Sequence, residues 1–155
     1  MICVECDPDE VLVTTLGFPP SDIRHEYGKG KACNTLQRKE GWVAMLDEDP
    51  TSAQPSYIRG LKERENTYGM RLLEDEARRN RVIFLRPRLE EWLIETARAQ
   101  SVDLGRLGLS MDVRALHEII TLRKNNLVKA IGVLGDSQRL GMLKQWLQET
   151  QHTKK

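Results

Sequence analysis

The chain has 155 residues, of which 39% are hydrophobic and 30% charged, and its formal net charge at pH 7 is +1. These values are typical of a soluble globular protein with one core, and they exclude a basic surface that covers the whole molecule. No apolar run approaches the roughly 18 residues needed to cross a bilayer, and the first residues do not resemble a secretory signal. We therefore expect a cytoplasmic protein that binds no membrane.

The first hundred residues alternate between short apolar runs and stretches with helical periodicity. Strands are expected at residues 2–6, 21–27, 42–46 and 82–85. Helices are expected at residues 10–16, 32–39, 71–79 and 89–100. A strand, helix, strand order predicts an α/β protein whose parallel sheet carries helices on both faces.

Beyond residue 100 the sequence is typical of helices. Apolar residues recur at helical spacing over 111–122 and 136–147, whereas 127–134 is apolar enough for a buried helix or a strand. We therefore divide the chain into an α/β core, residues 1–100, and a helical C-terminal extension, residues 101–155, packed on that core.

The three cysteines, Cys3, Cys6 and Cys33, are too few for a disulfide framework. Together with His25 they could in principle bind zinc. However, positions 3 and 6 of a strand face opposite sides, so we expect buried thiols instead. His25 is the histidine nearest to a basic loop and the one worth testing.

An Asp-x-Asp motif follows the apolar run at residues 43–46 and is closed by Pro50. Residues two apart on a strand point the same way, so we expect Asp47 and Asp49 to lie together at its C-terminal end. A hard cation such as Mg²⁺ would offset the repulsion between the two carboxylates. The alternative is a plain acidic turn.

Two further features strengthen the first interpretation. Glu5 ends the first apolar run as Asp47 ends the later one, so parallel strands would bring the two side chains to one sheet edge. Between them lies a loop with a flexible backbone and two ammonium groups, which could bind a phosphate: Gly28, Lys29, Gly30 and Lys31. Three carboxylates and a basic loop together predict a phosphodiester site.

This order of motifs resembles the TOPRIM family, the metal-binding domain shared by topoisomerases, bacterial primases and several nucleases. The family pattern is a strand ending in glutamate, a helix, a glycine-containing turn and a later strand ending in Asp-x-Asp. The matching motifs here, over about residues 1–55, are Val4-Glu5, Leu16-Gly17, Gly28-Lys29-Gly30 and Leu46-Asp47-Glu48-Asp49. The chain departs from the pattern at Cys6, where a glycine often stands, and in the proline-rich segment after Asp49.

The resemblance implies a nuclease that depends on Mg²⁺ or Mn²⁺. Asp47 and Asp49 would hold the ion, Glu5 would act as general acid or base or as a further ligand, and Lys29 or Lys31 would stabilise the developing negative charge. The substrate would be nucleic acid, with DNA favoured over RNA.

A looser likeness concerns the segment that opens with Arg86-Pro87-Arg88, which resembles small TOPRIM-like proteins of phage-defence loci. It implies Glu90 as a fourth carboxylate and Arg88 as a phosphate contact, although helix N-termini also favour acidic residues in general. It further implies a bacterial defence-type complex with an ABC-type ATPase as partner subunit, and it is compatible with a homo-oligomer.

Two alternatives stay open. The run Asp47-Glu48-Asp49-Pro50-Thr51 also resembles the first motif of haloacid dehalogenase-like phosphatases, in which Asp47 would be the nucleophile and Asp49 the acid/base. That alternative would use Lys124 or Lys129 and Asp136 later in the chain. The second alternative is a regulatory or structural subunit without catalysis, whose charged helices, Trp92 and Trp146 would contact a partner.

Overall fold

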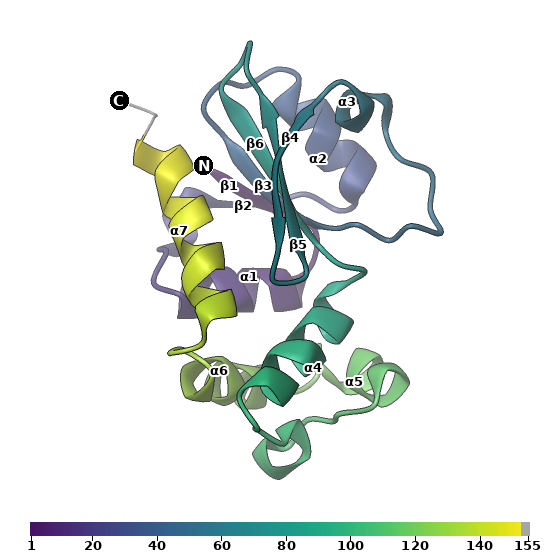
Figure 1. Ribbon diagram of the computed structural model, residues 1–155, viewed down its shortest axis with the longest axis vertical. Coiled ribbons are helices and arrows are strands. Elements are labelled where there is room, and N and C mark those ends of the chain that lie inside the picture. The colour runs from purple at the N-terminus through teal and green to yellow at the C-terminus, as the bar shows by residue number, and fades with distance from the viewer. Residues whose placement is uncertain (153–155) are drawn as a thin grey trace.

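A six-stranded sheet forms the centre of the computed structural model, with the strand order β2-β1-β3-β6-β5-β4 (Figure 1). The structure describes residues 1–152, and the side chains of residues 1–149. The strands are β1 (Ile2–Val4), β2 (Ile23–His25), β3 (Val43–Asp47), β4 (Lys62–Thr67), β5 (Met70–Asp75) and β6 (Asn80–Leu85).

The sheet is mixed but mostly parallel. Strand β1 pairs in parallel with β2 and β3, and β3 pairs in parallel with β6. The hairpin β4–β5 then extends the sheet in antiparallel fashion. The expected parallel sheet is therefore present in four of the strands, and the hairpin adds two that the sequence did not indicate.

The surface helix predicted at residues 71–79 is wrong, because that stretch contains β5 and the turn into β6. Met70 and Leu72 of β5 pack into one face of the core, whereas Leu73 packs into the other. Charged residues that could pair along a helix pair across the hairpin instead. Arg64 binds Glu74 and Glu76, and Arg71 binds Glu63.

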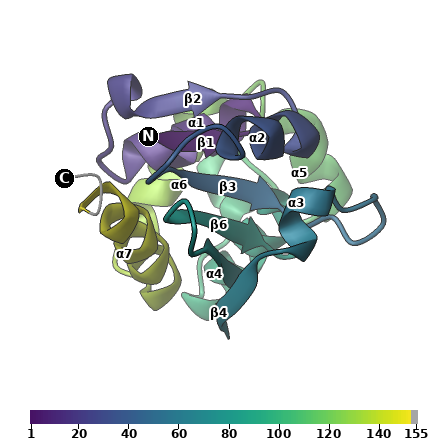
Figure 2. The same ribbon diagram turned by 90° about the horizontal axis from the view of Figure 1, so that it is seen from above.

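Helices cover both faces of the sheet (Figures 1 and 2). They are α1 (Asp7–Thr15), α2 (Lys29–Leu36), α3 (Ser56–Arg59), α4 (Leu89–Ala99), α5 (Val113–Ile119), α6 (Lys124–Val133) and α7 (Gln138–His152). Helices α1, α4, α6 and α7 share one hydrophobic core with the sheet, and α2 and α3 share the other. Successive strand residues alternate between the two cores, as Met45 and Leu46 do.

The helices after residue 100 belong to the larger of these cores. Leu104, Leu127 and Leu143 lie in the same buried cluster as Ile2 and Ile83. The segment 127–134, for which helix and strand were both open, is helical. Residues 153–155 of the predicted extension lie outside the described part of the chain.

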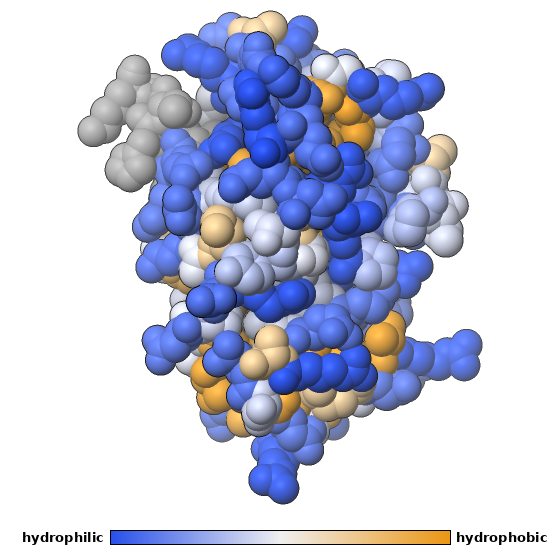
Figure 3. All heavy atoms as spheres, viewed as in Figure 1, coloured by the Kyte–Doolittle hydropathy of each residue, from blue (hydrophilic) through white to orange (hydrophobic). Residues whose placement is uncertain are grey.

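Trp92 and Trp146 are both buried, with relative exposures of 0% and 1%. They therefore anchor the core and are not available to a partner, contrary to the role considered for them in a docking subunit. The face seen in Figure 3 is mostly hydrophilic, with apolar residues in small groups. Among the described residues, no helix combines the length and the hydropathy that crossing a membrane requires.

Replacing Asn80 with Ala should lower the free energy of unfolding by roughly 2–4 kcal/mol, because several buried polar groups would lose their partners. The Asn80 amide group donates to the carbonyls of Leu36 and Lys39, and its oxygen accepts from the Trp42 backbone N–H. Urea unfolding followed by circular dichroism measures the effect. A loss below about 0.5 kcal/mol, the level usual for surface substitutions, would contradict this role.

Candidate functional site

An open pocket of about 560 Å³ lies where β1 and β3 end. Its lining residues are Glu5, Lys29, Gly30, Asp47, Asp49, Ser52, Ala53, Gln54 and Pro55. Five of these were singled out from the sequence, namely Glu5, Lys29, Gly30, Asp47 and Asp49. Four other candidates, Gly28, Lys31, Arg88 and Glu90, are not part of the lining.

The carboxylates of Glu5 and Asp47 are locked to the backbone around them. Glu5 Oε2 accepts a hydrogen bond of 2.8 Å from the Asp47 backbone N–H. Asp47 Oδ1 accepts one of 2.9 Å from the N–H of Leu89, the first residue of α4. The ends of β1 and β3 and the start of α4 are thereby joined, and each carboxylate keeps a second oxygen for a ligand.

Burial and like charges disfavour ionisation of Asp47. Its pKa is raised from the usual 3.8 to about 8, first by burial and then by the negative charges of Asp9, Glu5 and Glu90. Burial also raises the pKa of Glu5, against a lowering by the Asp47 N–H and by Lys29. Burial and the neighbouring negative charges thus both disfavour the ionised form of Asp47, and a divalent cation would relieve that cost.

Asp9 is the acidic residue that sequence reasoning missed. It is 1% exposed, its Oδ2 accepts a hydrogen bond of 3.3 Å from the Glu5 N–H, and its Oδ1 is buried without a hydrogen-bond partner among the described residues. Burial raises its pKa to about 7. In the sequence Asp9 was only part of an acidic turn before a helix. The usable signal was its spacing, because a residue four positions after Glu5 in the first turn of α1 returns to the strand end.

Asp49 lines the pocket, but strand alternation does not set its position as we expected. Strand β3 ends at Asp47, and Asp49 has a φ of 42°, in the left-handed region, so strand alternation does not place it. The hydroxyl of Thr51 donates to its carboxylate at 2.8 Å, and Arg88 lies 3.5 Å from it. These contacts lower the pKa of Asp49, with the Thr51 hydrogen bond as the larger cause. The pKa of Asp49 is thus lowered, whereas burial raises those of Asp9, Asp47 and Glu5.

Lys29 is the cation of the predicted basic loop that lines the pocket. Its Nζ donates to the Glu48 carbonyl at 2.8 Å and to Ser52 Oγ at 3.2 Å. Gly28 precedes it as the N-cap of α2 with a φ of 114°, a conformation that favours glycine. Lys31 is exposed on α2, outside the pocket lining, so the loop contributes one lysine to the pocket rather than two.

Arg88 and Glu90 lie at the start of α4, beside the pocket. Arg88 is shared between Asp49 and Glu91, at 3.5 and 3.4 Å. Glu90 is 8% exposed, and its carboxylate lies 3.2 Å from His117 Nδ1. Both line a second hollow of about 560 Å³ together with Arg114 and His117. Glu90 therefore acts on Asp47 and Asp9 through its charge.

Glu48, the middle residue of the Asp-x-Asp motif, is buried in ion pairs and is not part of the pocket lining. It is 8% exposed and binds Arg71 at 2.8 Å and Arg86 at 3.1 Å. Arg71 belongs to β5, so these contacts hold the hairpin against the end of β3. Asp47 and Asp49 do not take part in these ion pairs with Arg71 and Arg86, and both line the pocket.

The donors at the pocket are of the kind that a hard divalent cation prefers, because Glu5, Asp47 and Asp49 all offer carboxylate oxygens. Among the described residues, however, these three do not form a group whose ligand atoms lie within 4.8 Å of one another, so binding one ion would require them to move closer together. The cysteines do not contribute, because Cys3 and Cys33 are buried and burial raises their pKa values to about 12 and about 11. Within the described part of the chain they join no group of three potential metal ligands.

The residues that a haloacid dehalogenase-like mechanism would add are not in the pocket lining. Lys124 and Lys129 belong to α6, and Asp136 lies between α6 and α7. No protein-family model matches the chain, and searches of curated proteins and of solved structures find no match either. The TOPRIM resemblance therefore depends on the quoted motifs.

Proposed function

We propose that the chain is a Mg²⁺-dependent TOPRIM-like nuclease that cuts phosphodiester bonds of nucleic acid. The observation that carries the proposal is the hydrogen bond between Glu5 and the Asp47 backbone, because it joins the ends of the two strands that bear the family motifs. The pocket beside this contact also holds Asp49 and Lys29.

The residues suggest separate roles in such a reaction. Mg²⁺ or Mn²⁺ held by Asp47, Asp49 and Glu5 would neutralise charge on the phosphate oxygens. Lys29, tethered to Glu48 and Ser52, would place a second positive charge near the same oxygens. Alternatively, if Glu5 does not bind the ion, its carboxyl group, whose pKa is raised by burial, would hold a proton and deliver it to a leaving oxygen.

The substrate and the partner of the chain are part of the same proposal. DNA is the favoured substrate, and the chain would act as a subunit of a defence-type complex with an ABC-type ATPase. The alternative of a subunit without catalysis would need the fold but not the ionisable groups of the pocket. Substitutions of the pocket carboxylates therefore distinguish a nuclease from a subunit without catalysis.

The deciding experiment is a cleavage assay on supercoiled plasmid, single-stranded DNA and RNA, with Mg²⁺, Mn²⁺, Ca²⁺ or EDTA. We expect cleavage with Mg²⁺ or Mn²⁺ and none with EDTA. Folded wild-type protein that cuts none of the substrates with any metal would overturn the proposal of a nuclease that is active alone. Activity that appears only with an added ATPase partner would support the subunit form of the proposal.

A further inference from the structure

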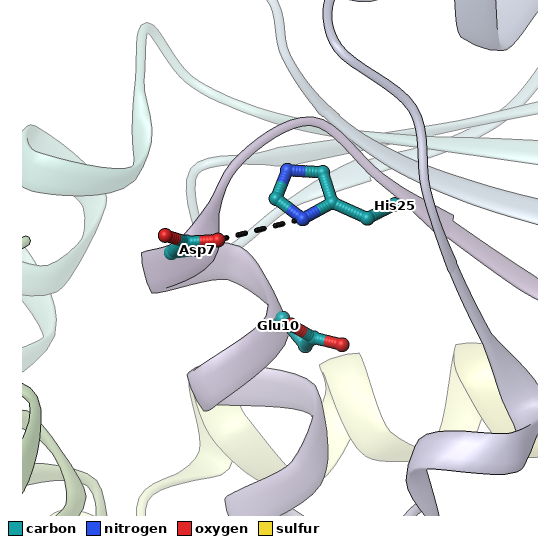
Figure 4. Close-up of side chains that lie close together, drawn as sticks. All are labelled: Asp7, Glu10 and His25. Carbon is teal, nitrogen blue, oxygen red and sulfur yellow. Dashed lines mark ion pairs between the residues drawn. The ribbon is translucent and has the colours of Figure 1, made fainter.

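Three side chains with metal-ligating atoms lie close together (Figure 4), and none of them is part of the pocket lining. Asp7 and Glu10 belong to the first turn of α1 and, three residues apart, share one face of the helix. His25 is the last residue of β2. One ligand atom from each of the three lies within 4.8 Å of the others.

The hydrogen bond of His25 determines which ring nitrogen faces the two acids. Nε2 lies 3.2 Å from the carbonyl oxygen of Glu5, and a carbonyl can only accept, so Nε2 carries the hydrogen. In the neutral ring, Nδ1 then presents a lone pair, and it lies 3.5 Å from Asp7 Oδ1. Two groups can bridge these atoms: a proton on Nδ1, which would make the contact an ion pair, or a metal ion. A histidine that donates through one nitrogen to a backbone carbonyl is also the common arrangement in metal sites.

The ring is held in place, whereas one acid can move toward it. The His25 side chain is 17% exposed, and its ring stacks on Tyr27 with centroids 4.5 Å apart. The Asp7 side chain is 71% exposed. Within the described residues, no Lys or Arg forms an ion pair with Asp7 or Glu10. His25 is therefore the basic side chain paired with Asp7 among the described residues, and its ring is already in place beside the two carboxylates.

We propose that Asp7, Glu10 and His25 bind a first-row transition-metal ion, Zn²⁺ above all, at a site separate from the cation pocket. One imidazole nitrogen and two carboxylate oxygens are a donor set that Zn²⁺ accepts at about 2.0–2.2 Å, with a further position left for water. Two donors bound to one such ion at these lengths lie about 3.3–3.5 Å apart, and Asp7 Oδ1 and His25 Nδ1, at 3.5 Å, already have that separation. The ion would tie β2 to α1 on either side of Glu5.

This inference does not rest on the proposed nuclease function, and its test uses binding alone. Protein without an affinity tag is stripped with EDTA, titrated with Co²⁺ while visible absorption is recorded, and then competed with Zn²⁺. We expect one tight equivalent in the wild type. His25→Ala should weaken it at least about tenfold, by analogy with the loss of groups that support a metal ligand. A double variant, Asp7→Asn with Glu10→Gln, should also weaken it while leaving the ring in place.

Two matched variants make the result decisive. His117→Ala removes an exposed histidine elsewhere, and Asp47→Asn removes a carboxylate of the pocket, so both should retain the tight Co²⁺ equivalent. Equal affinity in wild type and His25→Ala would overturn the proposal, as would an equal loss in His117→Ala. Loss only in Asp47→Asn would assign the ion to the pocket and also overturn it. Circular dichroism of each variant confirms that the comparison is between folded proteins.

Discussion

Replacing Asp47 with Asn should lower metal-dependent cleavage steeply and at the same time stabilise the metal-free protein. The amide oxygen of Asn can still accept the hydrogen bond from Leu89, so the start of α4 keeps its partner. The negative charge that burial and the acids Asp9, Glu5 and Glu90 disfavour is removed. We expect activity to fall by roughly 10²–10³-fold, the loss typical of one electrostatic group in an active site.

The gain in stability is the more distinctive part of this prediction. About 1 kcal/mol raises the midpoint of thermal unfolding by roughly 2–4 °C in a chain of this size. We expect a rise of at least this size at pH 8 in EDTA, measured by differential scanning fluorimetry, because a pKa raised from 3.8 to about 8 disfavours the folded state by more than about 1 kcal/mol at that pH. Glu40→Gln, which changes an exposed acid on the surface, is the matched control and should alter neither quantity. A metal-free Asp47→Asn protein that is less stable than the wild type would contradict the electrostatic account, whatever its activity.

The second large effect is a dependence of stability on pH that Mg²⁺ should remove. In the unfolded chain, Asp9 and Asp47 release their protons near pH 4, whereas in the folded protein they hold them to about pH 7 and about pH 8. Between these values the folded state binds more protons than the unfolded state, so its stability falls as the pH rises. The slope is at most about 1.4 kcal/mol per pH unit for each group.

Mg²⁺ competes with these protons, so it should stabilise the protein much more at pH 8 than at pH 5.5. The measurement is thermal unfolding at half-unit steps of pH, in EDTA and in Mg²⁺. Asp9→Asn should flatten the curve recorded in EDTA, and Glu40→Gln should not. Stability in EDTA that rises from pH 5.5 to pH 8 would show that Asp9 and Asp47 are ionised without metal, against the pKa values given above.

The parallel part of the fold could be predicted because its sequence signals are local. Residues 43–46 are a continuous apolar run, which suits a strand buried on both faces, and they form most of β3. The hairpin could not be predicted in the same way. The residues of β4 are nearly all exposed and polar, so they carry no apolar alternation, and Arg64 and Arg71 find their partners across strands rather than along a helix.

The best-predicted part of the candidate site lies at the strand ends. Glu5 directly follows β1 and Asp47 is the last residue of β3, and the parallel pairing of these strands brings the two side chains together. Asp9 could not be recognised, because an acid in the first turn of a helix is common for reasons of the helix dipole alone. Its burial depends on how α1 packs against the sheet, and that is a tertiary property.

The two outer strands differ in how they limit further strand pairing. At one edge, β2 has only three residues, and at the other β4 presents Lys62, Glu63, Arg64 and Glu65 in succession. Short edges and charged edges both discourage a second sheet from adding its backbone to the first. The charged residues that make β4 hard to recognise in the sequence thus also discourage edge-to-edge aggregation. Any assembly with other subunits would then form through side-chain surfaces and not through a continued sheet.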